Sequence, residues 1–166
     1  MATPVDLNIM KPLWYPPALT ERLTGINTGG SGESALPLTS EKMRQLVINE
    51  LLELFNHTNI ESVLEEKGYH QLADSAINYG IPRRLAYDSE QQWPSIREDI
   101  HTAVLRFEPR IIPETLTVRV LTGGEPQGKY GVISFAISAL IDWLPQPVEL
   151  FIHGHYDKGN DTFSLS

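Results

Sequence analysis

The hydrophobic residues of this chain change their spacing near residue 110, and this change limits the folds that the chain can adopt. Before it, apolar residues recur every three or four positions, which predicts helices. After it, apolar and polar residues alternate, which predicts strands. Helices first and strands second favour an α+β fold, with the N-terminal helices packed on one face of a mostly antiparallel C-terminal sheet.

Two apolar stripes define the longer predicted helices. The first starts near Ser40 and consists of Met43, Leu46, Val47, Leu51, Leu54 and Phe55. The second consists of Ile96, Ile100, Ala103, Val104 and Phe107. Between them, Thr58 and Glu61 fit a capping box for a short helix that ends near Gly68. Because Pro109 disfavours helical geometry at the residue before it, the second long helix should end close to Phe107.

The predicted sheet has one fully apolar face. In the segment after Gly131 that face carries Ile133, Phe135, Ile137, Ala139 and Ile141. Residues 148–152 repeat the alternation, and turn residues at 157–160 precede a last short strand at 162–165. One of these two late strands should lie at an edge of the sheet, where another chain can pair with it.

Residues 1–38 differ from the rest of the chain. Five prolines and a stretch rich in Gly and Ser at 25–34 predict a flexible arm, which leaves a compact domain at 39–166. Within the arm, residues 18–23 are long enough for only a turn or two of helix. Because a helix this short is unstable alone in water, we expect it to dock on another surface.

Composition argues against several classes of protein. The chain has 13 Lys and Arg against 21 Asp and Glu, a formal charge of −8, which disfavours binding to nucleic acid or to anionic lipid. It has no cysteine for disulfides or thiolate metal sites. The apolar stretch 132–144 is too short to insert in a membrane. Residues 1–10 lack the pattern of a signal peptide, so we expect a cytoplasmic protein.

The most informative polar cluster is Glu108-Pro109-Arg110. Pro109 stiffens the backbone between two opposite charges, and Arg110 offers a planar fork of donors to a carboxylate or a backbone carbonyl. The residues alone leave open whether these charges contact a partner or are only solvated at a helix end. A further alternative is a peptidoglycan hydrolase with Glu108 as general acid, but no motif marks the second carboxylate that such an enzyme needs.

His153, His155 and Asp157 alternate along one predicted strand. If the strand continues through Gly154, all three side chains point the same way, as metal ligands do. The alternative is a polar strand end that runs into a turn, and no motif indicates a fourth ligand. We therefore expect no metal and no cofactor.

Four stretches of the sequence together resemble one family. They are Phe107-Glu108-Pro109-Arg110 after an amphipathic helix, the segment Asp-Ser-Ala-Ile-Asn-Tyr-Gly-Ile-Pro at 74–82, the segment Ala-Leu-Thr-Glu-Arg-Leu at 18–23, and the strand 133–141 with 147–150 after it. They resemble segments of the TssE family. That family is the type VI secretion counterpart of the phage baseplate wedge protein that was once labelled lysozyme-like.

The resemblance implies a structural protein of a cytoplasmic baseplate, and no enzyme. It implies contacts with other wedge subunits, with the contractile sheath whose assembly the protein initiates, and with the hub and spike complex. It also implies which residues bind partners: Glu108, Pro109 and Arg110 in the domain, and Leu19, Arg22 and Leu23 in the arm.

Overall fold

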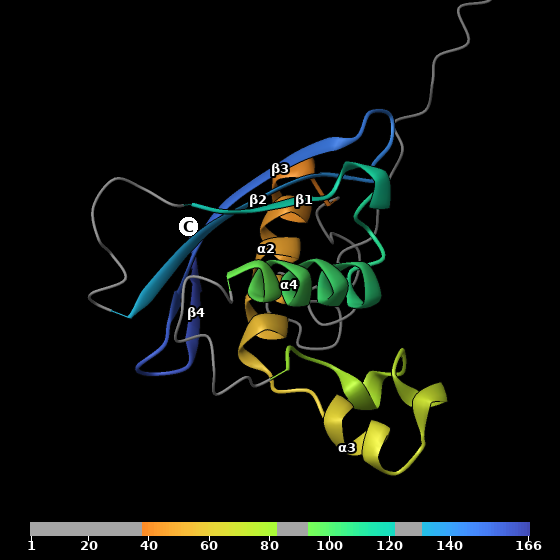
Figure 1. Cartoon of the computed structure of the whole chain (residues 1–166). Helices are drawn as coiled ribbons and strands as arrows, with labels where there is room; N and C mark the ends of the chain where they lie inside the picture. Colours follow the sequence, from red (N-terminus) through yellow and green to blue (C-terminus); the bar gives the residue numbers. More distant parts are fainter. Residues whose placement is uncertain (1–37, 83–92, 122–130) are drawn as a thin grey trace, which may run out of the picture.

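The computed structural model describes residues 38–82, 93–121 and 131–166, and it confirms the predicted α+β class (Figure 1). None of the described helices is both long enough and apolar enough to cross a membrane. The helices come first and the strands second. The elements are α2 (Ser40–Asn56), α3 (Glu61–Glu66), the 3-10 turns η1 (His70–Leu72) and η2 (Ala76–Asn78), α4 (Trp93–Phe107), the 3-10 turn η4 (Pro113–Thr115), β1 (Thr117–Val120), β2 (Val132–Ile141), β3 (Val148–Asp157) and β4 (Thr162–Leu165).

The four strands form one antiparallel sheet in the order β1-β2-β3-β4. Strands β2 and β3 pair along their whole length. Strand β4 pairs only with residues 154–157 of β3, and Ser166 extends this ladder to His153 through two backbone hydrogen bonds of 3.0 and 2.8 Å. In the described residues, the first half of β3 therefore has a neighbouring strand on one side only.

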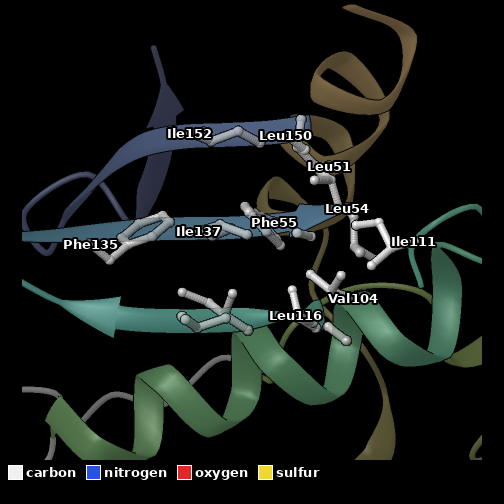
Figure 2. Close-up of a cluster of buried hydrophobic side chains, with 14 of the residues drawn as sticks. Leu51, Leu54, Phe55, Val104, Ile111, Leu116, Phe135, Ile137, Leu150 and Ile152 are labelled. Atoms are coloured by element: carbon white, nitrogen blue, oxygen red, sulfur yellow. The ribbon is translucent and has the colours of Figure 1, made fainter. Parts of the chain in front are cut away.

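Helices α2 and α4 cover one face of the sheet, and the predicted apolar face of β2 is the one that they bury (Figures 1 and 2). Alternation in β3 works in the same way, since its even-numbered residues are buried and its odd-numbered ones are mostly exposed. The helices contribute the predicted stripes to this core: Val47, Leu51, Leu54 and Phe55 from α2, and Ile96, Ile100, Ala103 and Val104 from α4.

A glycine lets β3 pass close to Phe135, the largest of the fully buried side chains. Gly154 lies opposite Phe135 in the ladder between β2 and β3. A Cβ atom at Gly154 would lie 2.2 Å from Cζ of Phe135. The ring of Phe135 packs edge-on against Phe55 and Phe163, with centroid separations of 6.3 and 6.0 Å. Glycine therefore leaves the space that the Phe135 ring fills.

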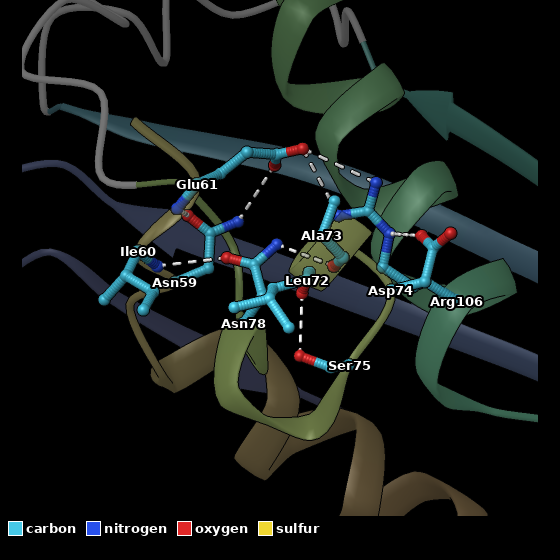
Figure 3. Close-up of polar contacts among 9 residues, drawn as sticks. All are labelled: Asn59, Ile60, Glu61, Leu72, Ala73, Asp74, Ser75, Asn78 and Arg106. Carbon is cyan, nitrogen blue, oxygen red and sulfur yellow. Dashed lines mark hydrogen bonds and ion pairs between the residues drawn. The ribbon is translucent and has the colours of Figure 1, made fainter. Parts of the chain in front are cut away.

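Between α2 and α4 the chain forms a small lobe, residues 58–82, which contains α3, η1 and η2 (Figure 1). Its centre is Asn78, a fully buried polar residue. The Asn78 side chain accepts a hydrogen bond from the Ile60 N–H at 3.2 Å and donates one to the Ala73 carbonyl at 2.8 Å (Figure 3). These bonds satisfy a buried amide and hold both ends of the lobe together.

The predicted capping box of α3 is wrong. Helix α3 starts after Ile60, and no side chain caps it from that position. Thr58 instead forms a parallel β-bridge with Ile81, and the Asn59 side chain accepts a 3.4 Å hydrogen bond from the Glu61 N–H. The bridge holds the backbone of Thr58 extended beside Ile81. Because the helix starts after Ile60, Thr58 lies two residues before the position from which a side chain could cap it.

Gly80 joins the lobe to the end of α2. Its φ is +121°, and a Cβ there would lie 2.4 Å from the His57 backbone oxygen. That oxygen accepts a 2.9 Å hydrogen bond from the Ile81 N–H. Glycine therefore allows both the positive φ and the close approach of two backbones.

Candidate partner-binding site

Helix α4 runs directly into the predicted Glu108-Pro109-Arg110 cluster. The Glu108 N–H still donates to the Val104 carbonyl at 2.9 Å, so the cluster begins on the last turn of the helix. The Arg110 carbonyl accepts a 2.7 Å hydrogen bond from the Asp142 N–H just after β2. The turn is therefore fixed to the helix at one end and to the sheet at the other.

Glu108 is only 3% exposed, although it is charged. Its Oε1 accepts from Nε of Arg110 at 2.7 Å, and its Oε2 accepts from Nη2 at 2.5 Å. Oε1 also accepts from the Arg110 backbone N–H at 3.1 Å. This pairing compensates a charge that is costly to bury alone. The hydrogen bond to Glu108 is also the main reason why the pKa of Arg110 is raised above its ordinary value.

Arg110 has a second carboxylate partner on α2. Its Nη2 also donates to Glu50, whose side chain is 53% exposed, while the Arg110 side chain is 27% exposed. No described residue accepts a hydrogen bond from Nη1 of Arg110. The guanidinium is thus held from the inside by Glu108 and reaches the surface with a pair of unused N–H donors.

Tyr79 brings the lobe into contact with this cluster. Its ring lies edge-on to His57 and to Phe107, with both centroid separations at 5.4 Å. Its hydroxyl donates to the Glu50 backbone carbonyl at 3.4 Å. Burial raises the pKa of Tyr79, and nearby carboxylates, first of all Glu53, raise it further. Two of the stretches on which the family resemblance rests, 74–82 and 107–110, therefore meet in space.

The predicted site residues have different outcomes. Glu108 and Arg110 lie together, with Glu108 buried, and Pro109 beside them is exposed. Leu19, Arg22 and Leu23 fall within residues 1–37, outside the described part of the chain. The sequence does not indicate Glu50 as a site residue, because no motif distinguishes it from the other exposed carboxylates of α2.

A groove of about 550 Å³ lies between α3 and α4. Its lining includes carboxylates from both helices, among them Glu65 and Glu98, and also Arg106. Glu108 does not line it. The carboxylate that a hydrolase would need as its general acid is therefore not part of this groove.

His153, His155 and Asp157 lie on the outer face of β3, as strand alternation predicts. His155 is hydrogen-bonded to Ser134 at 3.0 Å, and His153 packs edge-on against Phe151 with centroids 4.8 Å apart. Across residues 38–82, 93–121 and 131–166, no group of three or more His, Cys, Asp or Glu could hold a metal ion.

Comparison with known families gives one match. The family model described as baseplate wedge protein gp25 matches residues 41–146, a range that contains the lobe, α4 and the Glu108-Pro109-Arg110 cluster. The chain belongs to this family. It is a structural component of the baseplate of a contractile injection system and assembles with other baseplate components. TssE is the type VI homologue of gp25, so the predicted resemblance is confirmed. No curated protein and no solved structure matches the chain.

Proposed function

We propose that this chain is the TssE-type wedge subunit of a type VI secretion system. It works in the cytoplasm, binds the other wedge subunits and initiates assembly of the contractile sheath, without catalysing a reaction. The observation that carries this proposal is the geometry of Arg110, whose guanidinium is held by a buried carboxylate and still reaches the surface.

This geometry suits recognition of a partner. Glu108 fixes the orientation of the guanidinium before any partner arrives, so less side-chain entropy is lost on binding. The unused Nη1 donors can bind a carboxylate or a backbone carbonyl of a wedge subunit. Removing one member of a buried interfacial charge pair typically costs about 2–5 kcal/mol or more of binding free energy.

The arm contributes further contacts in this proposal. Leu19, Arg22 and Leu23 dock on neighbouring wedge subunits or on the hub and spike complex, because a segment as short as 18–23 gains helical structure only against another surface.

A peptidoglycan hydrolase fits the site less well. A general acid has to reach the glycosidic oxygen of its substrate. Glu108 is buried, and both its carboxylate oxygens accept hydrogen bonds from Arg110. Glu50, the second carboxylate that contacts Arg110, binds the same guanidinium, so the cation lies between the two acidic groups in the place where a hydrolase would bind its substrate.

The wedge contact is tested with Arg110→Lys. Lysine keeps the positive charge beside Glu108 but loses the planar fork. We expect at least about a tenfold loss in capture of wedge subunits by the tagged chain, with a thermal melt that stays cooperative because the charge beside Glu108 is kept. The matched control is Arg97→Lys, since among the described residues the exposed Arg97 pairs only with the neighbouring Glu98, at 3.5 Å. Normal capture by Arg110→Lys would exclude the cluster as a wedge contact.

In this proposal a strand of the sheath pairs with the edge of β3 at residues 148–152, where β4 does not cover it. His153 exchanges two hydrogen bonds with Ser166, so the backbone groups of odd-numbered residues of β3 point toward the β4 side. At Phe151 that side has no strand among the described residues, and the Phe151 side chain is exposed. The Glu149 carbonyl is covered, because Nε of Arg44 donates to it at 3.1 Å. Phe151 therefore offers the free N–H and C=O groups that an added strand needs.

The other late strand is less suited to pairing. The side chain of Asn56 accepts from the Phe163 N–H at 2.9 Å and donates to the Phe163 carbonyl at 3.1 Å. These two bonds occupy the outer edge of β4 at its centre. Such a contact is a typical way of protecting an edge strand.

A proline at residue 151 tests the strand-pairing proposal. Phe151→Pro removes the edge N–H and leaves the ladder with β2 intact, because the backbone of odd-numbered residues faces away from β2. We expect loss of sheath nucleation with retained wedge binding and a cooperative melt. Phe151→Val is the control, since it keeps the N–H and the preference for a strand. If the folded proline variant nucleates sheath at the normal rate, the edge is not used.

A further inference from the structure

The two carboxylates that bind Arg110 are held very differently. Glu108 is buried and uses both oxygens, at 2.7 and 2.5 Å, together with a backbone bond. Glu50 is half exposed and reaches only Nη2 of Arg110. Within the described residues, no other side chain donates to the Glu50 carboxylate. Water can therefore replace the contact to Glu50 at little cost, whereas the contact to Glu108 is part of the fold.

We infer that Glu50 is a displaceable internal ligand of Arg110, which occupies in the free protein the position that a carboxylate of a wedge partner takes in the baseplate. This inference rests on the proposed function, because it assumes that Arg110 contacts a wedge subunit. Nη2 has two hydrogens, of which one bonds Glu108 and the other Glu50. A partner carboxylate that binds end-on to Nη1 and Nη2 needs the second of these hydrogens, so it has to displace Glu50.

The exchange has a defined chemical consequence. An acidic side chain replaces another acidic side chain, so Arg110 stays paired before and after assembly. A partner that offers only a neutral acceptor gains less from the exchange, because it does not replace the Coulomb attraction between Arg110 and the negative charge of Glu50. Glu50 thus lowers the affinity of the site for ligands that need Nη2 and, among these, favours carboxylates.

The experiment compares Glu50→Gln with the unaltered chain. The probe is the wedge complex purified from cells that lack this chain, titrated with tagged full-length variants. Glutamine keeps the helix and the size of the side chain but removes the competing charge. We expect about two- to fivefold tighter binding, which is the range that an exposed ion pair spans. Glu50→Ala, which removes the acceptor as well, should bind at least as tightly.

The matched control is Glu53→Gln. Glu53 lies one turn further along α2, is exposed, and makes no hydrogen bond to Arg110. Glu53→Gln removes the same charge from the same helix without affecting a contact to Arg110, so this variant should leave the affinity for the wedge complex unchanged. An equal gain in Glu50→Gln and Glu53→Gln would mean a general charge effect and would overturn the inference.

The remaining outcomes also decide. Weaker binding of Glu50→Gln would mean that Glu50 itself contacts the partner, and unchanged binding would mean that it does not compete; either result overturns the inference. These results leave the proposed function intact as long as Arg110→Lys loses binding. If Arg110→Lys binds normally, Arg110 is not the contact and both proposals fail.

Discussion

Arg106 and Arg110 lie one helical turn apart, and each pairs with two carboxylates, but their partners are buried to different extents. Nε of Arg106 lies 2.9 Å from Oδ1 of Asp74, and its Nη1 lies 3.4 Å from Oε1 of Glu61 (Figure 3). These two carboxylates belong to the lobe and are 84% and 31% exposed. The Glu108 partner of Arg110 is 3% exposed.

The comparison shows that the number of ion pairs says little about their energetic role. Exposed pairs contribute little to stability, whereas breaking a buried pair leaves a charge without compensation. Arg106 therefore links α4 to the lobe through ion pairs that contribute little to stability. Arg110 belongs to a buried pair that is formed within a single turn, so its orientation does not depend on the lobe.

The largest effect is expected for Arg110→Ala. This change leaves the buried Glu108 carboxylate without its cation, which should lower the free energy of unfolding by about 3–5 kcal/mol. Urea denaturation measures it. The double variant Glu108→Gln/Arg110→Ala removes the buried charge as well and should recover much of the loss. A change below about 1 kcal/mol in Arg110→Ala would mean that the pair behaves like an exposed one.

Asn78→Ala should have the next largest effect, because it sharpens the role of the lobe. It leaves the Ile60 N–H and the Ala73 carbonyl without partners, at a cost of about 1–3 kcal/mol for each group that stays buried. Hydrogen exchange should accelerate in residues 58–82 more than in β2. The control is Asn49→Ala on the exposed face of α2. Equal acceleration in both regions would mean that the lobe and the sheet open together.

Arg106→Ala should cost less than about 1 kcal/mol of stability, because its two carboxylate partners remain accessible to water. Secretion should continue, in contrast to Arg110→Lys. Thermal melts and a secretion assay on both variants make the comparison directly. Loss of secretion in a folded Arg106→Ala variant would contradict the contrast between the two arginines, because the ion pairs between α4 and the lobe would then be needed for assembly.

The smallest effect is a loss of stability at alkaline pH that depends on Tyr79, the residue at which the lobe contacts the cluster. Its pKa is raised in the folded state, mainly by burial, so the unfolded chain loses this proton first as the pH rises. The protonated Tyr79 hydroxyl therefore contributes to the free energy of unfolding. This contribution is fully present below about pH 10, the ordinary pKa of tyrosine, and is lost as the pH rises through the pKa that Tyr79 has in the folded state. Tyr79→Phe keeps the ring and should flatten this decline in urea titrations above pH 10. An unchanged slope would contradict it.

Sequence patterns predicted the elements that depend on local spacing. The stripe of α2 and the apolar face of β2 are buried as expected, because periodic side chains have to meet one core. The cap of α3 was not predictable in the same way. Thr58 and Glu61 match a local motif, but a bridge to Ile81, 23 positions away, takes the backbone of Thr58.

The site was only partly predictable for the same reason. The sequence indicates Glu108 and Arg110 as a pair, but the depth of Glu108 depends on how the end of α4 meets the sheet. Glu50 lies 60 positions from Arg110, and only the crossing of α2 and α4 brings the two together. The sequence also does not decide between β3 and β4 as the strand with a free edge. The structure separates them, because β4 covers only part of β3 and the Asn56 side chain occupies the outer edge of β4.

The close approach of Gly154 to Phe135 makes these two positions depend on each other across the sheet. A larger residue at 154 needs the space that the aromatic ring now occupies, so it becomes acceptable only with a smaller side chain at 135. In homologous sequences the two positions should therefore vary together, with a glycine opposite an aromatic residue or a residue with a Cβ opposite an aliphatic one. Such covariation would report the register of β2 and β3 without any structure.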